Sequence, residues 1–520
     1  MTKTGFPEMR FTFLLFASLA SACISPEENR SRAADAKIRA DAERGNAAAQ
    51  FELGSMYRNG VRVAKDPVLA VSWYRKAANQ GHAEAERKLG QMYEEGEGVA
   101  QEYAEAVRWY HKAADQGDAG GQFCLGNMYL YGRGVPQDYT QAILWYRKAA
   151  DQGDPGAQNS LGYRYREGQG VPQNYAEAIA WFRKAADQGD FGGQHALGDM
   201  YHDGQGVLRD YALAIMWYRK AADQGFPEAQ LNLGAMYVKG EGVPKDSAQA
   251  AVWFRKAAGQ ENADAQYILG AMHANGEAVP RDYKQAVAWY RKAADQGLAK
   301  AQLELGRMYA NGEAVPRDYK QAVAWWQMAA DQGDAGGQLF LGAMYAKGEG
   351  VPQDYKQAIA WWRKAADQGN AAAQFSIGAV YYSGEGVPQD YVQAVSWYRK
   401  AADQGDADAQ FNLGNMSYFG KGVEQDYSRA MKWYHQAADQ GNANAQFSLG
   451  IMYGEGKGVP QDYAQAQMWA TLAAARTSGD DQKEKAGLRD RISALMTPGQ
   501  IAEAQKLARE WVEAFDRRNK

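Results

Sequence analysis

Residues 154–189 read DPGAQNSLGYRYREGQGVPQNYAEAIAWFRKAADQG, and this stretch predicts two helices joined by a glycine-rich loop. Asp154 is a favoured N-cap residue, and Pro155 suits the first helical position, where no backbone N–H is needed. Gly168 is placed to end the first helix in the left-handed conformation. Apolar residues recur at helical spacing again over residues 175–188, which predicts the second helix.

The pattern of this unit recurs with a period of 36 residues along most of the chain. A glycine that follows leucine or isoleucine in the first helix recurs at that period, and so does a tryptophan in the second helix. Residues 46–477 therefore form twelve copies of one helix-turn-helix unit. The glycines are Gly54, Gly90, Gly126, Gly162, Gly198, Gly234, Gly270, Gly306, Gly342, Gly378, Gly414 and Gly450.

Because the same chain fills each slot twelve times, slots that never vary indicate backbone and packing demands. The slot of Ala157 is always Ala or Gly, which predicts that two backbones approach closely there. Asn174 and Glu177, three residues apart, match a capping box, in which each side chain bonds the other's backbone N–H. The recurring tryptophan, Trp289 among them, is expected to be buried core.

Two glycine slots lie in the loop between the helices. The Gly168 slot is glycine in all twelve units, as a positive φ would require. The second slot is less strict, because Arg62, Ala278 and Ala314 occupy it in three units. We therefore expect its geometry to tolerate a side chain, with slight strain in those loops.

These patterns predict an all-α fold, an α/α superhelical solenoid of twelve 36-residue helix-turn-helix repeats with helical caps. The end units of a solenoid must shield apolar faces that would otherwise be exposed. Residues 23–45 are expected to form a tether and an N-terminal capping helix, and residues 478–520 the C-terminal capping helices. Thr497, Pro498 and Gln500 mark the start of the last of these helices.

Composition excludes several classes of function. The chain has 58 basic and 62 acidic residues, a formal net charge of −4, and so lacks the basic field that nucleic-acid binding uses. Its two cysteines cannot build a disulfide framework or a thiolate zinc site. Nucleic acid is therefore not expected as a partner, and stability is expected to come from packing.

The N-terminus resembles an export signal. Residues 11–19 form an apolar run after Arg10, and Ala20-Ser21-Ala22 precedes Cys23. This order predicts a signal peptide over residues 1–22 and an exported protein. Cys23 stands where bacterial lipoproteins carry their lipid, which predicts a periplasmic or membrane-tethered lipoprotein; an ordinary cleavage site beside an incidental cysteine is the alternative. Membrane contact is expected only through that lipid.

The repeat motif itself resembles a known family. Residues 122–153 read QFCLGNMYLYGRGVPQDYTQAILWYRKAADQG, and this motif is similar to that of the Sel-one-like repeat (SLR) family, relatives of the tetratricopeptide repeats. Residues 496–502 also resemble the closing segment of bacterial members, although Gly499 replaces the usual acidic residue. The resemblance implies an α/α superhelix that serves as an adaptor or scaffold, without naming a partner.

No catalytic, cofactor or metal site is predicted. A metal site of His195, Asp199 and His202 would have suitable helical spacing, but these residues occupy variable slots and form no recognised metal motif. Cys124 stands between apolar residues without a nearby histidine and is expected to be unreactive. We expect a chain that is not an enzyme and that needs no cofactor.

A protein partner is expected to bind along the exposed side of the first helices. At about 100° per residue, the slots opposite the buried side form a shallow apolar trough with basic flanks in the middle units. Such a trough suits an amphipathic helix or an extended segment carrying acidic residues, and a merely solvated face is the alternative. The predicted groove residues are Ile268, Ala271, Arg307, Phe340, Ala343 and Lys347.

The leading functional hypothesis is thus an envelope adaptor that holds a protein partner in the solenoid groove. The second is a structural or carbohydrate-associated factor of cell-wall or exopolysaccharide machinery, with a glycan as possible partner, suggested by Tyr131, Tyr163 and Phe419 as exposed aromatic residues. A cell-wall hydrolase is a third reading, but no carboxylate pair or nucleophile can be assigned to it.

Overall fold

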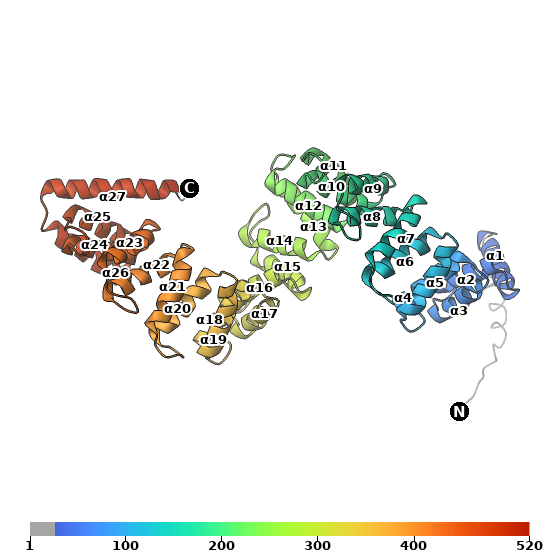
Figure 1. Cartoon of the computed structure of the whole chain (residues 1–520), viewed down its shortest axis with the longest axis horizontal. Coiled ribbons are helices and arrows are strands. Elements are labelled where there is room, and N and C mark those ends of the chain that lie inside the picture. Colours follow the sequence, from blue (N-terminus) through green and yellow to red (C-terminus); the bar gives the residue numbers. More distant parts are fainter. Residues whose placement is uncertain (1–25, 519–520) are drawn as a thin grey trace, which may run out of the picture. The chain divides into compact units, whose positions relative to one another are not determined.

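The structure is a computed structural model that describes residues 26–518, in which all regular structure is α-helical (Figure 1). The predicted all-α stack of helical pairs is confirmed. Its contacts divide the chain into two compact units, residues 1–253 and 254–520, with the boundary inside α13 (Ser247–Gly259). The predicted signal peptide and lipidation site Cys23 lie outside the described residues.

The helices of the first unit, before α13, are α1 (Pro26–Glu43), α2 (Ala47–Asn59), α3 (Pro67–Ala78), α4 (Ala83–Glu95), α5 (Tyr103–Asp115), α6 (Ala119–Tyr131), α7 (Tyr139–Asp151), α8 (Pro155–Glu167), α9 (Tyr175–Asp187), α10 (Phe191–Asp203), α11 (Tyr211–Asp223) and α12 (Pro227–Lys239). Those of the second, after α13, are α14 (Ala263–Asn275), α15 (Tyr283–Asp295), α16 (Ala299–Asn311), α17 (Tyr319–Asp331), α18 (Ala335–Lys347), α19 (Tyr355–Asp367), α20 (Ala371–Ser383), α21 (Tyr391–Asp403), α22 (Ala407–Phe419), α23 (Tyr427–Asp439), α24 (Ala443–Glu455), α25 (Tyr463–Ala475), α26 (Gly479–Ser493) and α27 (Pro498–Arg518).

The helices begin and end where the sequence signals predict. The Asp154 side chain accepts a hydrogen bond from the Ala157 N–H at 2.8 Å and caps α8. Gly168 ends that helix with a φ of 69°, in the left-handed region. The second loop slot is left-handed as well, and Ala278 and Ala314 hold φ values of 60° and 59° there. A side chain is tolerated in that slot with the strain expected for a residue that is not glycine.

The predicted capping box of the second helix is only half formed. Asn174 Oδ1 accepts from the Glu177 N–H at 3.1 Å, but the Asn174 N–H donates to the Tyr165 carbonyl at 2.8 Å. The Asn174 N–H is therefore not available to the Glu177 side chain, because it already bonds a carbonyl at the end of the first helix. A complete box occurs instead at α27, where Thr497 and Gln500 bond reciprocally at 2.9 and 3.3 Å.

The core of each repeat lies between its two helices and those of the next repeat. A Cβ added at Gly121 would lie 2.8 Å from the Ala113 Cβ, which confirms the predicted close approach of two helices at that slot. The fully buried aromatic residue is the one after the recurring tryptophan, as in Tyr146 and Phe182. Trp289 is partly exposed, with the Lys292 ammonium 4.4 Å above its ring, so the prediction that it is buried core was wrong. The prediction for the tryptophan slot is confirmed in five other repeats, at Trp145, Trp181, Trp217, Trp253 and Trp469.

Hydrogen bonds of a recurring buried glutamine link successive repeats. Gln122 donates to the Ala114 carbonyl at 3.2 Å and accepts from Gln152 at 2.9 Å, and the same pair recurs in most repeats. Glu86 takes the place of that buried glutamine in the second repeat and accepts from Gln116 at 2.6 Å. Burial raises the pKa of the Glu86 carboxyl, because its charged form loses hydration.

Replacing Glu86 with glutamine should therefore stabilise the protein at neutral pH by about 1 kcal/mol, the usual net value of a restored buried hydrogen bond. A carboxyl whose pKa is higher in the folded state than in the unfolded state contributes stability at pH values below its unfolded pKa. That contribution is lost as the pH rises through the folded-state pKa. Urea unfolding from pH 4 to pH 8 should show a gain for Glu86→Gln that shrinks toward pH 4, whereas a gain independent of pH would contradict this assignment.

Candidate functional site

In some repeats the first helix packs directly on the first helix of the next repeat, and we call these first helices together the first-helix layer. Direct packing occurs between α4 and α6, between α8 and α10, and between α22 and α24, and it exceeds the packing between neighbouring second helices. Side chains on the outer side of this layer lie at equivalent slots, one repeat apart. We call this side of each unit its first-helix surface.

The structure places the predicted groove residues on the first-helix surface of the second unit, at the equivalent slots expected. Their side chains are partly exposed, and Lys347 is exposed. The residues are Ile268 and Ala271 on α14, Arg307 on α16, and Phe340, Ala343 and Lys347 on α18.

Four of these residues already have partners within the chain, since Ala271 and Ala343 pack against hydrophobic core clusters. The Phe340 ring stacks on Trp326, with 5.0 Å between centroids and 20° between planes. Arg307 Nη2 lies 2.7 Å from Glu304 Oε2. Glu304 therefore offsets the positive charge of Arg307, which was expected to attract an acidic segment. Lys347 is the groove residue whose charge remains exposed.

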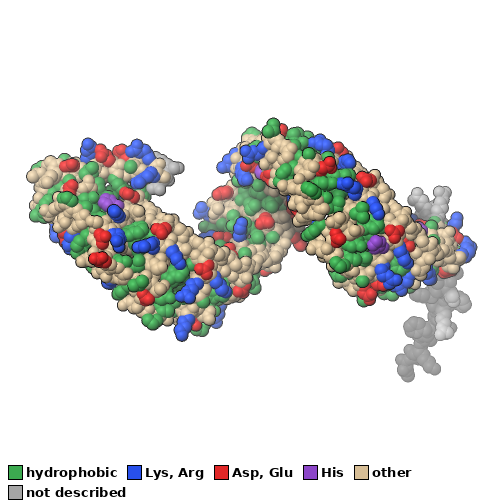
Figure 2. All heavy atoms as spheres, in the orientation of Figure 1, with side chains coloured by type: hydrophobic (Ala, Val, Ile, Leu, Met, Phe, Trp, Pro, Cys, Tyr) green, Lys and Arg blue, Asp and Glu red, His purple; other side chains and the backbone are tan. Residues whose placement is uncertain are grey.

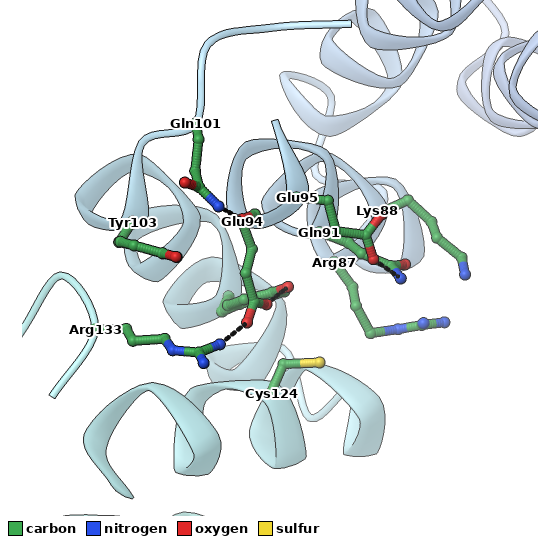
Figure 3. Close-up of a pocket in the computed structure, with 10 residues that line it drawn as sticks. Arg87, Lys88, Gln91, Glu94, Glu95, Gln101, Tyr103, Cys124 and Arg133 are labelled. Atoms are coloured by element: carbon green, nitrogen blue, oxygen red, sulfur yellow. Dashed lines mark hydrogen bonds and ion pairs between the residues drawn. The ribbon is translucent and has the colours of Figure 1, made fainter. Parts of the chain in front are cut away.

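A pocket in the first unit was not anticipated from the sequence. It has a volume of about 600 Å³ and lies between α4, α5 and α6 (Figure 3). Its volume falls within the range of known ligand pockets, but its lining is mostly polar. The lining residues are Arg87, Lys88, Gln91, Glu94, Glu95, Gln101, Tyr103, Tyr110, Cys124 and Arg133.

Most of the charged groups in this pocket are bonded to one another. Glu94 accepts from the Tyr110 hydroxyl at 2.7 Å and lies 3.5 Å from Arg133. Glu95 pairs with Arg58 at 2.8 Å. Burial raises the pKa of the Cys124 thiol to about 11, so the nucleophilic thiolate is scarce at neutral pH. The pocket can bind a polar group, and Cys124 gives it no reactive nucleophile.

The two histidines considered for a metal site have different partners. The His202 ring nitrogens lie 2.7 Å from Asp203 and 3.2 Å from Glu241, whereas His195 Nε2 lies 3.7 Å from Asp199. Burial lowers the pKa of His195. Burial also opposes the charge of His202, but the two carboxylates outweigh it and raise its pKa. Within residues 26–518, no group of three or more His, Cys, Asp or Glu side chains is arranged to hold a metal ion.

Basic and acidic side chains are interspersed over the face of the molecule that Figure 2 shows, without a large area of one sign. The pairs across repeats explain part of this pattern. Arg58 bonds Glu97 at 2.9 Å and His202 contacts Glu241, and in both cases the residues are 39 apart, one repeat plus three. Residues of opposite charge 39 positions apart could therefore have predicted these polar contacts of the first unit from the sequence.

A family model described as Sel1 repeat matches twelve segments between residues 47 and 478. The chain belongs to the Sel1 repeat family. The segments are residues 47–82, 83–118, 119–154, 155–190, 192–226, 227–262, 263–298, 299–334, 335–370, 371–406, 407–442 and 443–478.

Solved structures include similar Sel1 repeat proteins. The chain is 39% identical to c5321, a protective antigen of uropathogenic Escherichia coli with an SLR fold, over 86% of this chain and 95% of that one, with a TM-score of 0.72. It is 36% identical to a Sel1 repeat protein from Oxalobacter formigenes, over 59% of this chain and 89% of that one, with a TM-score of 0.46. No curated protein matches the chain.

The described residues are accounted for by the repeats and the helices at their two ends. Over residues 26–518 the fold is a repeat scaffold without a catalytic domain. In the same part of the chain, no helix has both the length and the apolar character needed to cross a bilayer.

Proposed function

We propose that this Sel1 repeat protein is an exported scaffold that binds a protein partner on the first-helix surface of its second unit. The observation that carries the proposal is the row of equivalent slots on α14, α16 and α18, at which small and apolar side chains remain partly exposed. Ile268, Ala271 and Ala343 offer apolar contact there, and Lys347 adds an exposed charge. Extended surfaces of this kind are what solenoid proteins use to bind other chains.

The proposal includes the location of the protein. Residues 1–22 would direct export, and Cys23 would carry a lipid that tethers the mature chain to the envelope membrane. The polar residues that follow Cys23 would connect this tether to the first repeat. A periplasmic or membrane-tethered scaffold of this kind would meet partners from the cell envelope.

Site-specific photocrosslinking tests which surface binds. A photoreactive amino acid replaces Ala271 or Ala343 on first helices, and Ala288 or Ala360 on second helices serve as matched controls in the same two repeats. The controls are the more exposed positions, so exposure alone would favour them. In intact cells, Ala271 and Ala343 should crosslink to the same discrete protein band and the controls should not. Equal crosslinking from the second helices would reject the proposed surface.

A carbohydrate-associated role is the second candidate, because Tyr131 and Phe419 are 61% and 62% exposed. Aromatic faces of this kind can stack on sugar rings. Tyr163 does not support this reading, since its side chain is only partly exposed. A glycan array with Tyr131→Ala and Phe419→Ala variants separates this role from protein binding.

A further inference from the structure

The pocket between α4, α5 and α6 contains one cation that the fold leaves unpaired. Arg133 lies 3.5 Å from Glu94, and Glu95 pairs with Arg58. Arg87 lies 3.0 Å from Asp118 and 3.2 Å from Glu84. Each of these charges therefore has a partner of opposite sign.

Lys88 makes no hydrogen bond or ion pair with any residue between 26 and 518. Its ammonium also lies near other positive charges. Figure 3 shows Lys88 and Arg87 extending side by side in the same direction. Burial lowers the pKa of Lys88, and the nearby charges of Arg87 and Arg58 lower it further, against weaker effects of Glu84 and Cys124. An anion beside Lys88 would favour its charged form in two ways. It would replace the hydration that the ammonium loses on burial, and it would offset the repulsion by the neighbouring cations.

The surrounding residues limit what that anion can be. Glu94 and Glu95 line the same pocket, so a multiply charged phosphate would meet two carboxylates as well as the cation. A single carboxylate needs one unpaired ammonium, which is what the pocket offers.

We propose that this pocket binds a carboxylate group of a polypeptide partner, with Lys88 as its counter-ion. The carboxylate belongs either to the C-terminus of the partner or to one of its acidic side chains. This inference rests on the proposed function, since it gives the first unit a second contact with a bound protein. The site lies on α4, so it uses the same first-helix layer at another point along the chain.

Competitive lysine labelling on the full chain tests the site. An amine-reactive ester is added in limiting amount at pH 8, and mass spectrometry measures the modification of each lysine. Three peptide probes are compared, namely N-acetyl-tetra-alanine with a free carboxylate, its C-terminal amide, and an amidated peptide with one internal aspartate. The free carboxylate or the aspartate peptide should protect Lys88, and which one does so identifies the source of the carboxylate.

The amide probe should protect nothing, and Lys112 on the adjacent helix should keep its labelling rate with every probe. A Lys88→Gln variant should weaken binding of the protecting probe by about tenfold or more in an NMR titration, as loss of a charged hydrogen bond would. Lys112→Gln is the matched control and should bind as the wild type does. Equal protection by the amide, or unchanged binding by Lys88→Gln, would overturn the assignment. A failure of both carboxylate probes to protect Lys88 would also overturn the assignment. The proposed scaffold function would not be affected by that result, because photocrosslinking at Ala271 tests it independently.

Discussion

Replacing Phe182 with alanine should lower the free energy of unfolding by about 3–5 kcal/mol, the usual range for removing a buried phenyl ring. Phe182 is fully buried and has no polar atom whose loss would complicate the comparison. Its ring fills the space between the two helices of its repeat and makes a T-shaped contact with Tyr163. The cavity would remain because the backbones on either side are held by neighbouring repeats.

Guanidinium unfolding followed by circular dichroism measures this effect, and Trp289→Ala is its control. Trp289 is also a large aromatic residue of a second helix, but it is partly exposed. Its truncation should cost clearly less, although more atoms are removed. A loss at Trp289 equal to that at Phe182 would mean that the tryptophan slot, and not the following slot, holds the core.

The second large effect is expected from Gly126→Ala. Alanine is favoured over glycine in a helix by about 1 kcal/mol, so propensity alone predicts a gain. However, the new Cβ would lie 2.6 Å from the Tyr146 ring, and Tyr146 is fully buried. Overpacking of this kind costs about 1–3 kcal/mol, so after the propensity gain we expect a net loss of up to about 2 kcal/mol.

The last repeat provides a matched control for that glycine. Gly450 occupies the same slot, but Ala470 stands where the other repeats have an aromatic residue. The nearest atom to a Cβ there is the Ala466 carbonyl oxygen, at 3.2 Å. Gly450→Ala should therefore be close to neutral in the same unfolding measurement. If the two variants lost the same stability, glycine would be required in this slot by the helix itself and not by contact with the Tyr146 ring.

The 36-residue period was enough to predict the fold, because each unit carries its own start and stop signals. Asp154 and Gly168 delimit a first helix without reference to the rest of the chain, and the structure confirms both. The capping box at Asn174 failed because its N–H bonds a carbonyl nine residues earlier, which a local motif does not reveal. Trp289 and the residue after it are 100° apart on one helix, so periodicity could not decide which of them is buried.

The candidate site was less predictable for a physical reason. Slots along the first helices could be predicted from helical angles, and of the six groove residues five are partly exposed and Lys347 is exposed. Side-chain partners could not be read in the same way, since Phe340 stacks on Trp326 and Arg307 pairs with Glu304 through rotamers that depend on packing. The Lys88 pocket combines three helices, and its one unpaired charge becomes visible only when every other pair is known.

Hydrogen–deuterium exchange on the full chain, with and without the crosslinked partner, tests the central claim most directly. If the first-helix surface of the second unit binds the partner, α14, α16 and α18 should exchange more slowly in the complex, and α15, α17 and α19 should be unchanged. Protection of the second helices, with the first helices unaffected, would contradict the account.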